Sequence, residues 1–139
     1  METASFQLKD YQFTRVELHK ANLKSTDLGL SFDVSGQFSK INGVSNFQLT
    51  FETIAQSKGA EDDFLHIVCV ANFVFENVST QEEIPDFFYT NSVAILFPYV
   101  RAYVSLLTSQ AQVRPLVLPT LNLTHLSEPL KANTTTKSE

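Results

Sequence analysis

The chain has 139 residues, a length that fits one domain with a modest hydrophobic core. Hydrophobic residues make up 43% of it and charged residues only 18%, which excludes an intrinsically disordered acidic protein. The net charge is −5 and the 10 lysines and arginines are scattered, so nucleic acid and anionic membranes are poor partners.

The first half of the chain predicts β-strands. Residues 6–18 carry apolar side chains near every second position, with slips around Lys9–Asp10 and Thr14–Arg15 that predict β-bulges. Residues 28–39 alternate strictly between apolar and small or polar side chains, which is typical of a strand with one buried face. Asn42–Gly43 then predicts a two-residue hairpin turn, because a type I′ turn needs positive φ at both positions.

Two further strands are predicted after this turn. Residues 46–54 alternate like the preceding strand, whereas residues 64–76 are apolar on both faces. The second face of that last strand must therefore be covered by another subunit, a helix or a client. The single cysteine, Cys69, lies in this run and is interpreted as a small buried hydrophobe. His66 is three positions away and points to the opposite face of a strand, which argues against a nucleophilic pair.

The second half predicts a helix. Thr80 and Glu83 have capping-box spacing, and Asp86–Tyr89 places three aromatic residues in a predicted loop. Residues 90–110 have helical apolar spacing that includes Pro98, and the apolar positions extend well beyond one face. Such a helix is expected to be buried on most sides. Its main stripe consists of Val93, Leu96, Val100, Tyr103 and Leu107.

The C-terminal segments have different compositions. Residues 114–123 are apolar with two prolines, which predicts an extended segment packed on another surface. Residues 128–139 are mostly polar, so we expect one domain over residues 1–127 and a disordered tail over 128–139. The N-terminus lacks a secretory signal pattern and no apolar run approaches the roughly 18 residues of a membrane span. A cytoplasmic location without membrane insertion is expected.

No pattern of catalytic residues is evident. The three histidines, His19, His66 and His125, lack the paired spacing of a metal site. The four glycines are dispersed, so no phosphate-binding loop is predicted, and there is no serine-elbow motif. We expect neither enzymatic activity nor a cofactor.

Three segments around the predicted helix resemble one family. Ile95-Leu96-Phe97-Pro98-Tyr99-Val100-Arg101, then Ser105–Ser109, then Leu116–Leu123 resemble the SecB family of bacterial protein-export chaperones. The resemblance implies an α+β fold, with a four-stranded antiparallel sheet and C-terminal helices on one side. It implies a homotetramer, a dimer of dimers, with long helices at the interface, which would place the stripe of the helix there. It also implies an ATP-independent holdase that captures unfolded polypeptides in apolar grooves.

The expected groove residues are mostly apolar positions beside irregular backbone. The candidates are Phe73, Phe75, Phe87, Phe88, Tyr89, Leu116, Val117, Leu118, Leu121 and Leu123.

Alternatives to export by SecA concern both the partner and the function. Export-dedicated members of the family dock the SecA motor through acidic residues, including those of the first strand. At the aligned positions this sequence has Arg15 and His19 instead of acids. A second branch of the family protects an antitoxin. SecA delivery and antitoxin protection are both kept as hypotheses. Outside the family, a Phe-lined sheet is also compatible with a protein that binds a small apolar ligand or lipid, or with a non-chaperone interaction module.

Overall fold

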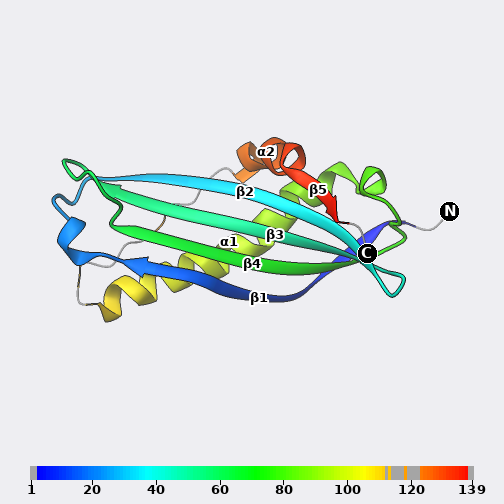
Figure 1. Cartoon of the computed structure of the whole chain (residues 1–139), viewed down its shortest axis with the longest axis horizontal. Coiled ribbons are helices and arrows are strands. Elements are labelled where there is room, and N and C mark those ends of the chain that lie inside the picture. Colours follow the sequence, from blue (N-terminus) through cyan, green and yellow to red (C-terminus); the bar gives the residue numbers. More distant parts are fainter. Residues whose placement is uncertain (1–2, 112, 114–117, 119–122, 138–139) are drawn as a thin grey trace.

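The computed structural model describes residues 3–111, 113, 118 and 123–137. One sheet, in the order β1-β4-β3-β2-β5, is crossed on one face by the long helix α1 (Figure 1). The strands are β1 Ser5–Leu18, β2 Leu28–Ile41, β3 Val44–Ser57, β4 Leu65–Glu76 and β5 Thr134–Lys137. The helices are α1 Asp86–Gln110 and α2 Ser127–Ala132, with 3-10 turns η1 Lys20–Asn22, η2 Gln81–Glu83 and η3 Leu123–Leu126.

The α+β class is confirmed, but the predicted sheet is corrected. Four strands pair antiparallel as expected, whereas β5 adds a fifth strand parallel to β2, so the sheet is mixed. The added strand comes from the predicted disordered tail. Residues 127–137 instead form α2 and β5, and Leu130 is fully buried. A polar, threonine-rich segment can form an edge strand because threonine favours β-structure, and one buried leucine anchors it.

Local signals in the strands are confirmed in detail. The pairing of β1 with β4 shifts register between Leu8 and Asp10 and again between Phe13 and Arg15, at the two predicted bulges. Asn42 and Gly43 have φ values of 52° and 79°, as the predicted hairpin turn requires. Every residue of β2 therefore pairs with β3 in one continuous register.

The helix begins earlier than predicted. Asp86–Tyr89, expected as a loop, form the first turn of α1, which follows Pro85 and continues through Pro98. The amide of Phe88 donates to the carbonyl oxygen of Pro85 over 3.0 Å. Two of the three aromatic residues of this turn, Phe88 and Tyr89, are therefore buried in the core instead of standing in a loop.

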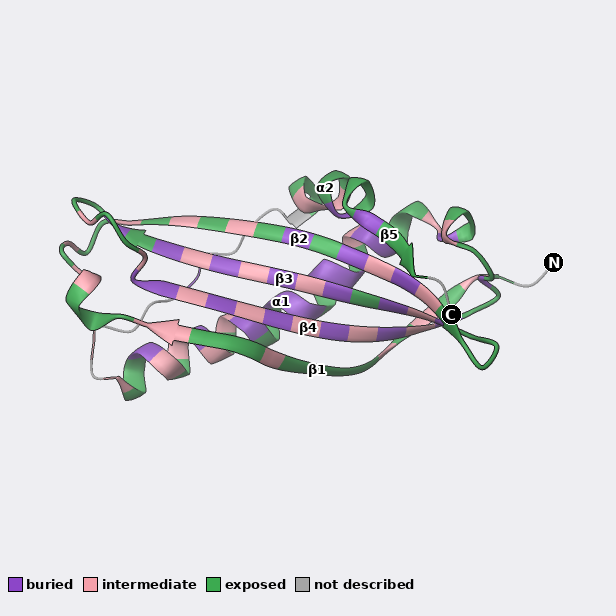
Figure 2. Ribbon diagram, in the orientation of Figure 1, coloured by how far each residue is buried: buried purple, intermediate pink, exposed green. Residues whose placement is uncertain are grey.

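The core lies between the sheet and α1 (Figure 2). The ring of Phe47 on β3 meets that of Phe88 on α1 edge-on at 4.8 Å between centroids, and Phe51 meets Phe97 at 6.1 Å. All four rings are at most 5% exposed. Each buried phenylalanine stabilises the fold by about 1.5–3 kcal/mol relative to an exposed one, so these contacts hold α1 on the sheet.

The expectation that no apolar segment approaches the length of a membrane span needs revision for α1. By length and apolar composition, α1 is a helix that could cross a membrane. In the structure one face of α1 is packed on the sheet, and an apolar core helix meets the same criteria as a membrane span.

Candidate functional site

The exposed side of α1 is largely apolar. We define this outer face by Phe87, Ile95, Tyr99 and Leu106, whose exposed fractions lie between 37% and 55%. They follow one another at helical spacing, and Arg101 is the only charged residue of α1 after Asp86. An uncharged face of this length is the kind of surface that proteins cover with a partner.

Aromatic stacking extends the outer face onto the edge strand β1. Tyr11 stacks on Tyr99 with 4.5 Å between ring centroids, and Phe13 stacks on Tyr103 at 4.1 Å. Tyr11 is 39% exposed, so part of this contact is accessible. The accessible apolar surface therefore runs from α1 to the outermost antiparallel strand.

A second accessible apolar surface lies at the opposite edge of the sheet. We define the β2 rim as Leu28, Leu30 and Phe32, half-buried side chains packed against the core on the α1 side of β2. The ring of Phe32 meets those of Phe51 and Phe97 at 5.8 and 6.0 Å. This rim could not be predicted from the sequence, because alternating apolar and polar residues occur both in central strands and in strands at the edge of a sheet.

The predicted interface stripe lies mostly on the other face of α1. Val93, Leu96 and Val100 are fully buried against the sheet of the same chain, where they cannot face a second subunit. Tyr103 and Leu107 are half-buried. The most regular apolar stripe of the helix fills the core of its own subunit. The candidate subunit interface is therefore the outer face of α1.

The predicted groove residues fall into three groups: buried residues, one exposed residue, and residues outside the described part of the chain. Phe73, Phe75, Phe88, Tyr89 and Leu118 are buried, and the rings of Phe73 and Phe75 both pack on that of Phe88. Phe87 is 48% exposed. For the buried residues, a client contact would require α1 or its neighbours to move off the sheet. Leu116, Val117 and Leu121 lie outside the described residues, as does the side chain of Leu123.

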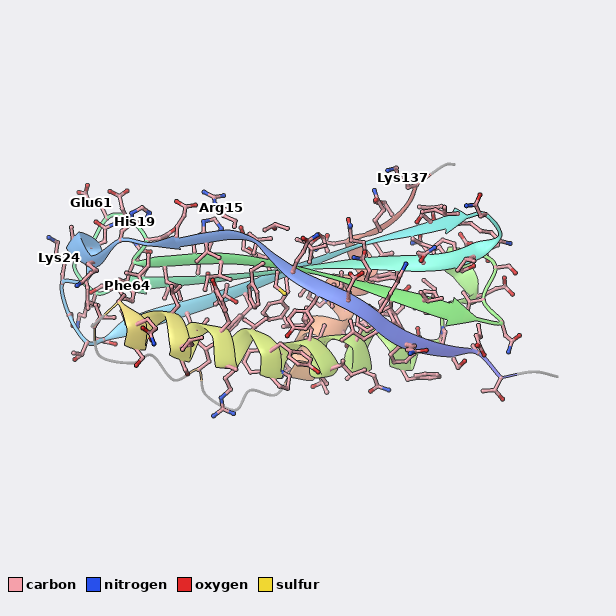
Figure 3. All side chains as sticks on the ribbon, turned by 90° about the horizontal axis from the view of Figure 1, so that it is seen from below. Arg15, His19, Lys24, Glu61, Phe64 and Lys137 are labelled. Carbon is pink, nitrogen blue, oxygen red and sulfur yellow. The ribbon has the colours of Figure 1, made fainter. Side chains whose placement is uncertain are left out.

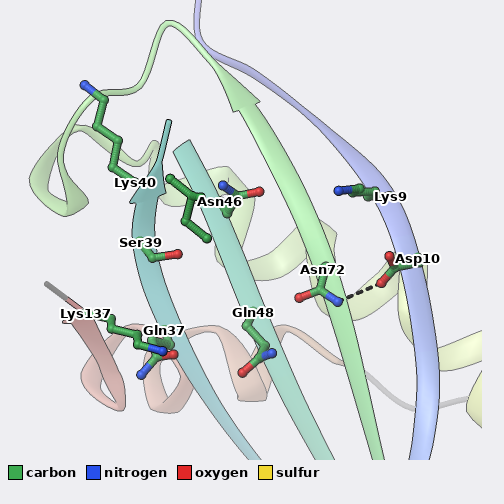
Figure 4. A pocket seen from close by; sticks show the side chains of 10 residues that line it. Lys9, Asp10, Gln37, Ser39, Lys40, Asn46, Gln48, Asn72 and Lys137 are labelled. Atoms are coloured by element: carbon green, nitrogen blue, oxygen red, sulfur yellow. Dashed lines mark hydrogen bonds between the residues drawn. The ribbon is translucent and has the colours of Figure 1, made fainter. Parts of the chain in front are cut away.

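The sheet face opposite α1 is mostly polar, although Val68, Val70 and Val74 of β4 also lie on it. At one end a hollow of about 440 Å³ is lined mainly by amide and lysine side chains (Figure 4). Asn72 donates to Asp10 over 2.6 Å, and Lys9, Lys40 and Lys137 surround the rest. Such a lining does not suit an apolar ligand. The hollow is therefore not the expected client groove.

The other end of this face carries a compact charged group. Glu17 accepts from the guanidinium of Arg15 and lies 3.3 Å from Nε2 of His19, and His66 meets Glu52 at 2.5 Å (Figure 3 labels Arg15 and His19). The hydrogen bonds from Arg15 and His19 hold the pKa of Glu17 below its usual range. The carboxylate is ionised but partly neutralised by its own neighbours.

Cys69 and His66 are not arranged as a nucleophilic pair. Cys69 is fully buried, and burial raises the pKa of its thiol to about 11, opposite to what a nucleophile needs. His66 lies on the other face of β4, as predicted. Among the described residues, no three His, Cys, Asp or Glu side chains gather into a metal site.

An α+β subunit with one long helix on its sheet and two accessible apolar surfaces has the features of a binding subunit. Its identity follows from comparison with known sequences: the model described as preprotein translocase subunit SecB matches residues 3–133. The chain belongs to the SecB family. Because that family consists of chaperones, the expectation of a non-enzymatic protein is confirmed.

Solved structures share the fold. The SecB-like chaperone Rv1957 of Mycobacterium tuberculosis, solved with a ChAD peptide from the Rv1956 HigA1 antitoxin, has a TM-score of 0.63 and 22% identity. The match covers 84% of this chain and 90% of that one. A protein of unknown function from Streptococcus agalactiae has a TM-score of 0.53 at 12% identity, covering 86% and 100%.

One curated relative matches part of the sequence. An uncharacterized protein of Methanocaldococcus jannaschii is 41% identical over 61 residues. The match spans 42% of this chain and 39% of that protein's length.

Proposed function

We propose that the protein is an ATP-independent holdase that binds non-native polypeptide segments on apolar surfaces of an oligomer in the cytoplasm. The observation that carries the proposal is the family match over residues 3–133. The two accessible apolar surfaces support the proposal, and we give each of them a different role. The outer face of α1 packs subunits together, and the β2 rim holds the client.

The outer face suits a helix–helix interface because small residues alternate with large ones there. Ala94, Pro98 and Ala102 are exposed between Ile95, Tyr99 and Leu106. Small side chains let two helices approach closely while large ones fill the gaps between them. A homotetramer, as a dimer of dimers, is the assembly we propose.

The β2 rim suits clients because it combines apolar side chains with an edge strand. Burial of apolar area supplies about 25 cal/mol per Å² before the entropy loss of binding is subtracted, and it requires no particular sequence. Half-buried Leu28, Leu30 and Phe32 offer such area on a stretch of β2 that no described strand pairs with on that side. Many weak contacts along an extended segment then add up to useful affinity.

The charged group on the outer sheet face bears on the choice of partner. Glu17 is paired with Arg15 and lies near His19, so this stretch does not present the free acidic surface expected for SecA docking. The structural neighbour from M. tuberculosis was solved with an antitoxin peptide. We therefore favour protection of an antitoxin-like client over delivery to SecA.

The test is suppression of aggregation without nucleotide. An enzyme unfolded in guanidinium is diluted into buffer with and without the protein, and light scattering is followed while column-coupled scattering gives the oligomer mass. Suppression near one client per oligomer is expected. A folded oligomer that leaves the scattering unchanged would remove the general holdase function and favour a small apolar ligand or a dedicated partner.

A further inference from the structure

The C-terminal strand β5 occupies one part of the β2 edge. Residues 134–137 pair in parallel with Gly36–Ser39 (Figure 1). The amide of Gly36 donates to the carbonyl oxygen of Asn133 over 3.2 Å, and the Asn133 side chain donates to the carbonyl oxygen of Val34 over 3.2 Å. The chain thus uses its own end to satisfy backbone groups of an edge strand.

The same edge continues beyond β5. Because alternate residues of a strand direct their backbone groups to the same side, Leu28, Leu30 and Phe32 present theirs on the side used by Val34 and Gly36. Among the described residues, no strand pairs with Leu28–Ser35 on that side. Leu28, Leu30 and Phe32 are also the β2 rim, so backbone groups without a strand partner in the described part of the chain lie beside apolar side chains.

The sequence and the contacts of β5 indicate that it binds the β2 edge only weakly. It has four residues, Thr-Thr-Thr-Lys, and only Thr134 is buried. Polar contacts hold it: Gln81 donates to the carbonyl oxygen of Thr134 over 3.1 Å, and Thr136 bonds the Gln81 side chain. An extended segment with apolar residues at the positions of Thr134 and Thr136 would bury more apolar area beside Phe38 and keep the backbone pairing.

We propose that β5 is an internal competitor, holding in parallel with Gly36–Ser39 the place at the β2 edge that an extended client segment takes when it binds. The inference rests on the proposed holdase function and specifies the client as an extended strand with alternating apolar residues. A client that pairs along Leu28–Ser39 must displace Asn133 and β5. Client affinity is therefore reduced by the fraction of molecules in which β5 has left the edge.

Deletion of residues 134–139 is the first test. The probe is a fluorescein-labelled peptide of about twelve residues in which valine alternates with serine, a length that covers the β2 edge. If β5 is displaced in about one molecule in ten, the deletion tightens the peptide Kd about tenfold by fluorescence anisotropy. Circular dichroism and urea unfolding show whether the shortened chain is folded.

A reversible lock tests the same idea without removing any residue. Gln37 and Thr135 are register partners, and neighbouring strands lie about 4.8 Å apart, within disulfide reach. The double variant Gln37→Cys/Thr135→Cys is expected to bind the peptide at least about tenfold more weakly when oxidised than when reduced. Each single cysteine variant is the matched control and should not respond to oxidation, since the native Cys69 is buried.

A second peptide separates strand addition from simple burial. Replacing its serines with prolines removes backbone donors while the valines remain, so binding is expected to fall strongly. Equal binding of the two peptides, or an oxidised lock that binds as tightly as the reduced form, would overturn the inference. Failure of the wild type to suppress aggregation would instead refute the holdase function itself, and the inference with it.

Discussion

Gly36 on β2 faces the ring of Phe47 on β3 so closely that a β-carbon at position 36 would overlap the ring. It would also lie 2.9 Å from the hydroxyl oxygen of Thr134 on β5. The absence of a side chain at Gly36 therefore allows a core phenylalanine and the C-terminal strand to meet at one point.

The first prediction follows from this contact. Gly36→Ala is expected to lower the free energy of unfolding by about 1–3 kcal/mol, because overpacking a buried site forces Phe47 or β5 to shift. Urea unfolding followed by circular dichroism measures it. Gly29→Ala is the matched control, since the nearest contact of an added β-carbon there is 3.9 Å away. Equal effects of the two substitutions would contradict the proposed packing.

Adjacent phenylalanines at the start of α1 provide the second prediction. Phe88 is fully buried among aromatic rings, so Phe88→Ala is expected to destabilise the fold by about 3–5 kcal/mol. Phe87 is 48% exposed, and Phe87→Ala should change stability by less than about 1 kcal/mol. Because Phe87 lies on the outer face of α1 and not on the β2 rim, Phe87→Ala is also expected to leave client binding unchanged, which anisotropy of a labelled unfolded client would show. A clear loss of client affinity in this variant would place Phe87 in the client groove.

The third prediction concerns the outer face of α1. Leu106→Glu places a charge on the most exposed apolar residue of that face, at 55% exposure. A buried unpaired carboxylate is strongly unfavourable in an interface, so the proposed tetramer should dissociate into dimers or monomers. Column-coupled light scattering reads the mass. Gln48→Glu on the opposite side of the sheet is the control, and a tetramer in both variants would place the interface elsewhere.

Local patterns predicted local structure well. The slips around Lys9–Asp10 and Thr14–Arg15 became the two bulges of β1, and Asn42–Gly43 became the hairpin turn. The capping spacing is also present: the amide of Thr80 donates to the Glu83 carboxylate over 3.0 Å. These features depend on neighbours in sequence, and their signals are contained in a few residues.

Features that depend on distant partners could not be predicted in this way. A helix that is apolar nearly all round does not reveal which side its own sheet covers, so Val93 was placed at an interface while Tyr99 and Leu106 were not. The edge position of β2 depends on the strand order. The pairing of β5 depends on Gly36, almost a hundred residues earlier in the chain.

The fourth prediction tests the β2 rim with two neighbouring residues. Leu30→Gln removes apolar area from the client side of β2, whereas Ser31→Gln changes the exposed polar side of the same strand. We expect Leu30→Gln to weaken client binding about three- to tenfold, as loss of one apolar contact implies, and Ser31→Gln to leave it unchanged. Anisotropy with an unfolded, labelled client measures both. Equal affinities would exclude the rim as the client surface.

The last prediction concerns pH and the buried thiol. Burial raises the pKa of Cys69 to about 11 from a reference value of 9.0. Well below pH 9 the thiol is neutral in both states and its contribution to stability is complete. As pH rises from 9 to 11 the unfolded chain ionises first, so stability falls by about 2–3 kcal/mol, at about 1.4 kcal/mol per pKa unit.

Burial also raises the pKa of Tyr89, which adds a loss of the same sign, so the wild-type slope alone does not isolate the thiol. Cys69→Ala is the informative comparison. Urea unfolding at pH 8, 9, 10 and 11 should show the variant losing less stability than the wild type across this range, whatever its offset at pH 8. Parallel pH profiles would mean that the thiolate is accommodated in the folded protein, and that Cys69 is less isolated from water than its position between the sheet and α1 indicates.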